Sequence, residues 1–188
     1  LDRCSNANGP LFDHSLEDLK TFDMGSWFDP AFEGERILSL EEGLRHLQTH
    51  NMKINLEIKV NGDETIALVE KVVEIVKQHW QHNDRLLFSS FSHDALCHLR
   101  RLMPQAHIGH LFEGMPEDWL NLAKTVKART IHADADLITE TEIKNILENG
   151  YPLYLYTVND MENAQTFFDQ GVSAIFTDVP QNCPENWL

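Results

Sequence analysis

From residue 54 onward, the chain alternates segments with the periodicity of a strand and segments with the periodicity of a helix. The first strand is expected at residues 54–60, where apolar and polar residues alternate, and a helix is expected at about 63–80. The same order repeats to the end of the chain. The further expected strands are 86–89, 107–112, 130–133, 153–158 and 173–176, and the helices between them are 92–103, 116–127, 139–148 and 161–169.

Strands that alternate with helices favour right-handed crossovers and a parallel sheet, so the fold class is α/β. An open doubly wound sheet and a (β/α)8 TIM barrel both fit this order, and the sequence contains no glycine-rich phosphate loop. A barrel has eight strands and typically about 250 residues. Six strands are expected here in 188 residues, so a barrel would have its first two strands before Leu1.

The segment before residue 37 is rich in turn-forming residues. One short helix is expected after Ser15, and Ser39 is predicted to cap a longer one. No linker or low-complexity segment divides the chain. We therefore expect a single domain over 1–188, with 1–36 as an inserted loop region and 37–188 as a helix followed by β/α units.

Composition and charge exclude several classes of partner. The chain is 42% hydrophobic and carries a formal charge of −15, which is typical of a globular protein that does not bind nucleic acid or an anionic membrane surface. No apolar run approaches the roughly 18–20 residues of a membrane span, so no membrane insertion is expected. Three widely spaced cysteines do not suggest a disulfide framework, and we expect a reducing, cytoplasmic location.

The first expected strand carries charged residues on one face. Alternation sends Asn55, Glu57 and Lys59 to the same side, with Glu57 and Lys59 roughly 7 Å apart along the strand. On an exposed strand such a pair partly neutralises itself. In a closed barrel, charged groups near the carboxyl end of a strand usually belong to an active site. Both interpretations stay open on the pattern alone.

Several segments resemble one family, in the expected order and over nearly the whole chain. They are residues 1–9, 22–28, 32–37, 39–42, 56–59, 89–91, 156–159 and 171–180. Together they resemble the glycerophosphodiester phosphodiesterases, most closely the short cytoplasmic bacterial type. Cys4 replaces a threonine of the family pattern, and the turn that follows is altered.

The resemblance implies a (β/α)8 barrel that hydrolyses glycerophosphodiesters to glycerol 3-phosphate and an alcohol, with Mg²⁺ or Ca²⁺ as cofactor. Glu57 falls on a metal-ligand position, Lys59 on a catalytic, phosphate-facing lysine, and Tyr156 on an aromatic position. The two catalytic histidines and the other metal-binding carboxylates of the family would lie before Leu1. Residues 1–188 alone are therefore expected to be inactive.

The chemistry agrees with these positions. Charge grows on the phosphodiester oxygens as the bond breaks, and fixed positive charge from a metal and a lysine stabilises it. Hard cations prefer oxygen ligands such as Glu57, and Lys59 supplies a point charge on the same face. Phe91 and Tyr156 are expected to bind substrate as an apolar wall against the glycerol or alcohol moiety.

Other readings remain. The strand histidines His107, His110 and His132 are predicted to pack or form hydrogen bonds, and His132 is the one considered for the barrel interior. A related barrel phospholipase D acting on lysophospholipids is an alternative function. A non-catalytic barrel that binds a glycerophosphate is another. The expected partner is a small molecule, and the sequence does not indicate an oligomeric state.

Overall fold

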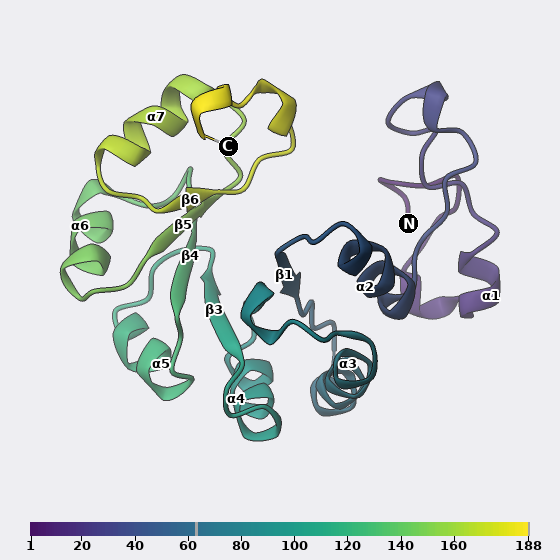
Figure 1. Cartoon of the computed structure of the whole chain (residues 1–188), viewed down its shortest axis with the longest axis horizontal. Coiled ribbons are helices and arrows are strands. Elements are labelled where there is room, and N and C mark those ends of the chain that lie inside the picture. The colour runs from purple at the N-terminus through teal and green to yellow at the C-terminus, as the bar shows by residue number, and fades with distance from the viewer. Residues whose placement is uncertain (63, 188) are drawn as a thin grey trace. The chain divides into compact units, whose positions relative to one another are not determined.

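The computed structural model describes residues 1–62 and 64–187 (Figure 1). The chain divides into two compact units. The N-terminal unit comprises Leu1–Asn51 and Gln78–Trp80, and the sheet unit comprises Met52–Lys77 and Gln81–Leu188.

The sheet unit is built on six parallel strands whose spatial order follows the sequence. A doubly wound sheet reverses its strand order at a switch point, whereas a (β/α) barrel keeps the order consecutive. The consecutive order therefore confirms the parallel α/β prediction and favours the barrel arrangement. The strands are β1 (Ile54–Glu57), β2 (Leu86–Ser90), β3 (His107–Phe112), β4 (Thr130–Asp134), β5 (Leu153–Tyr156) and β6 (Ala174–Ile175).

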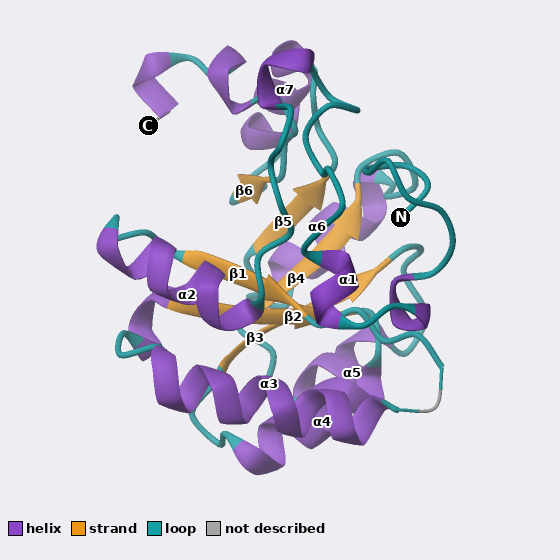
Figure 2. Ribbon diagram, turned by 90° about the vertical axis from the view of Figure 1, so that its right-hand side faces the viewer, coloured by secondary structure: helices purple, strands orange, loops and turns teal. Residues whose placement is uncertain are grey.

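Helices connect successive strands (Figure 2). They are α3 (Thr65–His79), α4 (His93–Leu102), α5 (Trp119–Thr125), α6 (Glu140–Glu148) and α7 (Met161–Asp169). In Figure 1, α4, α5, α6 and α7 follow one another around the outside of the curved sheet. A hydrophobic cluster packs α5, α6 and α7 against the sheet, with Ile131 and Leu155 from the strands and Ile143, Ile146 and Ala164 from the helices. The other face of each strand is left to line the interior side of the sheet.

The predicted elements exist, but several are shorter than expected. The strand predicted at 54–60 ends at Glu57, although Ile58 still donates a backbone hydrogen bond to Ser89 over 2.7 Å. The helix predicted at 116–127 begins at Trp119. Residues 116–119 form a turn instead, in which the Trp119 amide donates a hydrogen bond to the Pro116 carbonyl oxygen. The helix predicted at 63–80 begins at Thr65, and residue 63 lies outside the described residues.

The N-terminal unit contains α1 (Leu16–Leu19) and α2 (Leu40–Thr49). Both helices begin with a capping box. The hydroxyl of the N-cap serine accepts a hydrogen bond from the backbone amide three residues later, and the carboxylate of that later residue accepts one from the serine amide. Ser15 and Ser39 are the caps, as predicted from the sequence. Short 3-10 turns lie at Leu11–Asp13 and Pro30–Phe32 here, and at Asn83–Arg85, Pro180–Asn182 and Glu185–Trp187 in the sheet unit.

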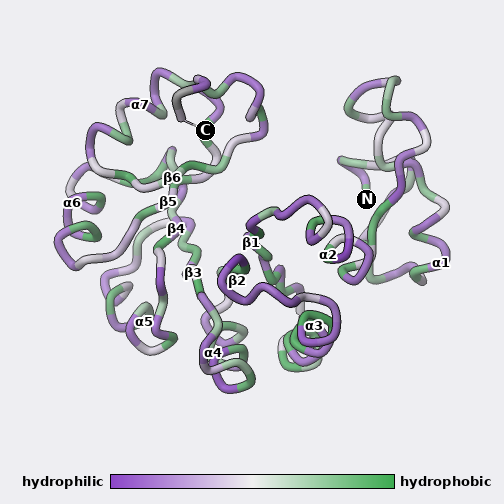
Figure 3. The backbone as a smooth tube through the Cα atoms, viewed as in Figure 1, coloured by the Kyte–Doolittle hydropathy of each residue, from purple (hydrophilic) through white to green (hydrophobic). Residues whose placement is uncertain are grey.

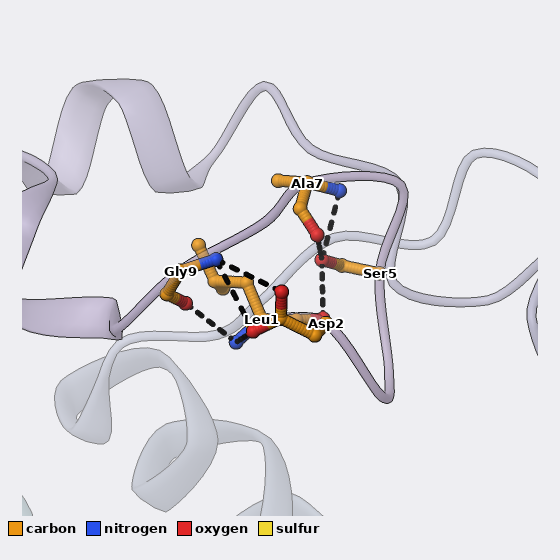
Figure 4. Close-up of polar contacts among 5 residues, drawn as sticks. All are labelled: Leu1, Asp2, Ser5, Ala7 and Gly9. Atoms are coloured by element: carbon orange, nitrogen blue, oxygen red, sulfur yellow. Dashed lines mark hydrogen bonds and ion pairs between the residues drawn. The ribbon is translucent and has the colours of Figure 1, made fainter.

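Side chains rather than regular structure hold the loops of the N-terminal unit. Asp23 accepts hydrogen bonds from the backbone amides of Gly25, Ser26 and Gly34, which hold the pKa of its carboxyl well below the usual range. In the first turn, the amide of Gly9 donates to the Asp2 carboxylate (Figure 4). Gly9 has a φ of +85°, a conformation that favours glycine.

The helices are amphipathic rather than uniformly apolar. Figure 3 shows hydrophobic and hydrophilic residues alternating around the turns of α3, whose buried residues are Val69, Val73 and Val76. Among the described residues, no helix has the length and apolar character required to cross a membrane.

Candidate active site at the carboxyl ends of the strands

Glu57 is the last residue of β1, and its side chain is 28% exposed. Its Oε1 atom is buried and accepts no hydrogen bond from the described residues. The Nζ atom of Lys59 lies 3.1 Å from this oxygen, an ion-pair distance, but the two atoms lack hydrogen-bond geometry. A buried carboxylate oxygen without a hydrogen bond is uncommon and is typical of a position that binds an ion or a ligand.

Lys59 lies two residues beyond the end of β1, and its side chain is 74% exposed. The sequence pattern placed it inside a strand, whereas the structure places it on the segment that follows. The ion pair with Glu57 nevertheless holds both side chains on one side of the chain. Lys59 is thus an exposed cation beside a partly buried carboxylate.

A groove of about 510 Å³ opens around these two residues. It lies where β1 and β2 end, which is the end of parallel strands where barrel enzymes carry their active sites. Its lining residues are Glu57, Ile58, Lys59, Val60, Asn61, Gly62, Ser90, Phe91 and Ser92.

Phe91 and Tyr156 meet at the same end of the sheet. Phe91 follows β2 and is 48% exposed, and Tyr156 ends β5. Their rings make an edge-to-face contact, with centroids 5.9 Å apart and planes at 86°. The Tyr156 hydroxyl donates to the carbonyl oxygen of Phe112 over 2.8 Å, which fixes the ring. The two predicted substrate-binding residues are therefore brought into contact with each other.

Negative charge surrounds Tyr156. Burial, followed by the carboxylates of Asp134, Glu113 and Glu57, raises the pKa of its phenol above the ordinary value. The hydroxyl is therefore neutral at physiological pH and acts as a hydrogen-bond donor.

Sequence reasoning missed two of these carboxylates. Asp134 is the last residue of β4, and Glu113 directly follows β3. Both satisfy the rule that drew attention to Glu57, since each is an acidic residue at the carboxyl end of a parallel strand. Within the part of the chain that the structure describes, no three histidine, cysteine, aspartate or glutamate side chains are grouped so as to hold a metal ion.

His132 lies in the middle of β4 and is fully buried. Its Nε2 atom is 2.9 Å from the Thr130 hydroxyl, and its ring stacks on Tyr154. Burial, with a smaller effect from His110, lowers its pKa to about 4. His132 is therefore a neutral packing residue at pH 7, as predicted for the strand histidines.

His110 is buried on β3 and lies against α4. Its Nε2 atom is 3.2 Å from Nδ1 of His93, and its Nδ1 atom is 3.2 Å from the Leu111 carbonyl oxygen. The Nε2 atom of His93 in turn lies 3.3 Å from the sulfur of Cys97. This hydrogen-bonded chain joins the sheet to α4, and burial lowers the pKa of His110 to about 4.

Comparison with known proteins places the chain among phosphodiesterases. Residues 1–182 match the model of the glycerophosphoryl diester phosphodiesterase family. A glycerophosphodiester phosphodiesterase from Caldanaerobacter subterraneus subsp. tengcongensis is 30% identical over 182 residues, which is 96% of this chain and 74% of that protein. One from Bacillus subtilis is 27% identical, over 96% of this chain and 67% of that protein.

A solved structure shares the fold closely. A phosphodiesterase from Oleispira antarctica, in complex with its product sn-glycerol-3-phosphate, superimposes with a TM-score of 0.91 and 29% identity. The superposition covers 96% of this chain and 73% of that one. From the family match and these relatives, we conclude that the chain belongs to the glycerophosphoryl diester phosphodiesterase family.

Proposed function

We propose that this protein hydrolyses glycerophosphodiesters to glycerol 3-phosphate and an alcohol. The observation that carries the proposal is the Glu57–Lys59 pair, at a groove beside the carboxyl ends of parallel strands, in a chain that matches the family over residues 1–182. The related enzyme from Oleispira antarctica binds sn-glycerol-3-phosphate as its product, which supports the same product class here.

Glu57 is proposed as one ligand of a divalent cation, Mg²⁺ or Ca²⁺. Its buried Oε1 atom accepts no hydrogen bond among the described residues and is the hard oxygen donor that these cations prefer. When bound, the cation would neutralise charge on the phosphate oxygens.

Lys59 is proposed to act on the same phosphate. Its ammonium group is exposed on the Glu57 side of the groove, so it can approach an oxygen of a bound phosphodiester. The positive charge would stabilise the charge that develops as the ester bond breaks. Phe91 and Tyr156 are proposed to contact the apolar carbons of the substrate, since their rings meet at this end of the sheet.

No proton transfer is assigned to the strand histidines. His110 and His132 are buried, and their pKa values near 4 keep both rings neutral at pH 7. A general acid or base needs a pKa closer to the working pH and access to the substrate.

The test is hydrolysis of glycerophosphocholine by the natural full-length protein, with glycerol 3-phosphate as the measured product. Reactions contain Mg²⁺, Ca²⁺ or a chelator, and lysophosphatidylcholine serves as the second substrate. Cation-dependent release of glycerol 3-phosphate would support the proposal. Hydrolysis of lysophosphatidylcholine alone would favour a phospholipase D. Binding of glycerol 3-phosphate without any turnover would favour a binding protein.

We also propose a cytoplasmic location. Cys4, Cys97 and Cys183 form no disulfide, which is consistent with a reducing compartment. Fractionation of cells that produce the natural protein would test this, and recovery in an extracellular or envelope fraction would contradict it.

A further inference from the structure

Basic residues stand at the amino ends of four consecutive strands. Lys53 precedes β1, Arg85 precedes β2, His107 begins β3 and Arg129 precedes β4. Parallel strands in consecutive order bring these positions to one edge of the sheet. This concentration of basic groups is notable in a chain whose formal charge is −15.

The four residues line one cavity of about 340 Å³. It lies at the end of the strands opposite the groove, because β1 contributes Asn55 to this cavity and Glu57 to the groove. Asp84 is the acidic side chain in its lining. The remaining lining residues are Ile54, Leu86, Leu87, Thr130 and Tyr154.

Arg129 and His107 are joined within this cavity. The Nη1 atom of Arg129 lies 3.2 Å from Nδ1 of His107. A guanidinium group can only donate, so Nδ1 accepts and the ring proton of neutral His107 is on Nε2. Both side chains therefore carry N–H donors. The Arg129 fork keeps further N–H groups, and Arg129 and Lys53 are exposed and accessible.

The charges that act on His107 are mainly positive. Burial and the charges of Arg129 and Arg100 lower the pKa of His107, and the opposing effect of Asp84 is the smallest of the four. The site thus disfavours a further cation. The two arginine charges, unlike burial, would also attract an anion.

We propose that this cavity binds a phosphate group, either free or esterified to a small alcohol, at the amino ends of β1–β4. Arginine offers a planar fork and lysine a point charge to a phosphate group, while Asp84 can accept from a ligand hydroxyl. A volume of about 340 Å³ is at the lower end for ligand pockets, which suits a phosphate on a small alcohol. The choice of glycerol 3-phosphate as the ligand rests on the proposed function, whereas the choice of inorganic phosphate does not.

The experiment follows the His107 ring signals by NMR while inorganic phosphate or glycerol 3-phosphate is added at constant ionic strength. Arg129→Gln and Lys53→Met each remove one cation from the cavity. Arg101→Gln is the matched control. On α4, outside the cavity, Nη2 of Arg101 lies 2.9 Å from Nδ1 of His98, which is the same kind of arginine–histidine contact. Lys59→Met reports on binding at the groove.

A saturable shift of His107 is expected, with affinity about tenfold weaker in each cavity variant, as for loss of one charge-assisted hydrogen bond. In Arg101→Gln and Lys59→Met, the affinity reported by the His107 shift should equal that of the unmodified protein. An equal response to chloride, unchanged affinity in both cavity variants, or loss of the shift in Lys59→Met would overturn the proposal. Tighter binding of glycerol 3-phosphate would identify the ester as ligand, and equal binding would identify free phosphate. If the protein binds phosphate here but hydrolyses no diester, only the proposed function fails.

Discussion

Glu57 Oε1 and Lys59 Nζ lie 3.1 Å apart at the end of β1 without a hydrogen bond between them. The contact balances charge but leaves the carboxylate oxygen without a donor and the ammonium group exposed. Ion pairs with an exposed partner contribute little to stability. Substitution of either residue should therefore change the chemistry of the groove more than the fold.

Glu57→Gln should abolish the cation dependence of hydrolysis and reduce the rate about 10²-fold or more, because a neutral amide is a poor ligand for a hard cation. The measurement is glycerol 3-phosphate release across a range of Mg²⁺ concentrations, with the unfolding temperature as a check on the fold. Glu148→Gln on α6 is the control, since it removes an exposed carboxylate that is distant from Glu57 in the sequence. Unchanged rate and unchanged cation affinity would exclude Glu57 as a ligand.

Lys59→Met should lower kcat about 10²–10³-fold, as for loss of one transition-state charge contact. Methionine keeps the apolar stem and removes the charge. Steady-state kinetics distinguish stabilisation of the transition state from binding of the substrate. Lys124→Met on α5 serves as a surface control. A change confined to KM would make Lys59 a binding residue instead.

Phe91→Ala should raise KM several-fold and leave kcat nearly unchanged, because an apolar wall binds substrate and transition state alike. Tyr156→Phe keeps the ring and loses the hydrogen bond to Phe112, so it should retain KM and lose about 1 kcal/mol of stability. Kinetics and urea unfolding of both variants check this. A KM unaffected by Phe91→Ala would place the substrate elsewhere.

Gly109→Ala should destabilise the protein by about 1–3 kcal/mol, as expected for an overpacked interior. A Cβ atom at this position of β3 would lie 2.5 Å from Nε2 of His132 and 2.8 Å from the Thr130 hydroxyl. Gly43→Ala on α2 meets nothing within 4 Å and should stabilise its helix by up to about 1 kcal/mol. Urea unfolding of the two variants should therefore give shifts of opposite sign. A tolerated alanine at 109 would show that His132 can move.

Acid should destabilise the sheet unit through His110 and His132. Their pKa values fall from 6.5 to about 4 in the folded chain, so between these values the unfolded state binds more protons. Stability is therefore complete above pH 6.5 and is lost as the pH falls toward 4, with a slope of up to about 1.4 kcal/mol per pH unit for each ring.

Urea unfolding at several pH values between 7 and 4.5 measures this slope. His132→Gln should make it shallower, because one of the two proton sites is removed. The same slope in the variant would assign the acid sensitivity to other groups.

The fold could be predicted largely because hydrophobic periodicity reports which side of each strand and helix is buried. Element ends were less certain, since periodicity continues past the last ladder hydrogen bond. Lys59 fits the alternation that begins at Ile54, yet β1 ends at Glu57. The helix expected at 116–127 is similarly shortened by the turn that begins at Pro116. The spacing of apolar residues does not reveal this turn.

The candidate site was only partly predictable. Glu57 and Lys59 are neighbours in the sequence, so one strand pattern revealed both. Asp134 and Glu113 are distant in the sequence, and their shared effect on Tyr156 follows from strand order. The basic residues at 53, 85, 107 and 129 also come from separate strands, so the cavity that they line has no local sequence signal.

The contacts from β3 to α4 also fix where protons reside. The Leu111 carbonyl can only accept, so Nδ1 of His110 carries a proton and its Nε2 accepts from His93. Nε2 of His93 is then an acceptor, and the thiol of Cys97 is its donor. The carbonyl oxygen of Leu111 thereby fixes the tautomer of each ring. It also fixes which atom donates in every bond of this hydrogen-bonded chain. The two imidazoles and the thiol consequently form one coupled unit, in which a proton added to Nε2 of His110 would remove the acceptor to which His93 donates.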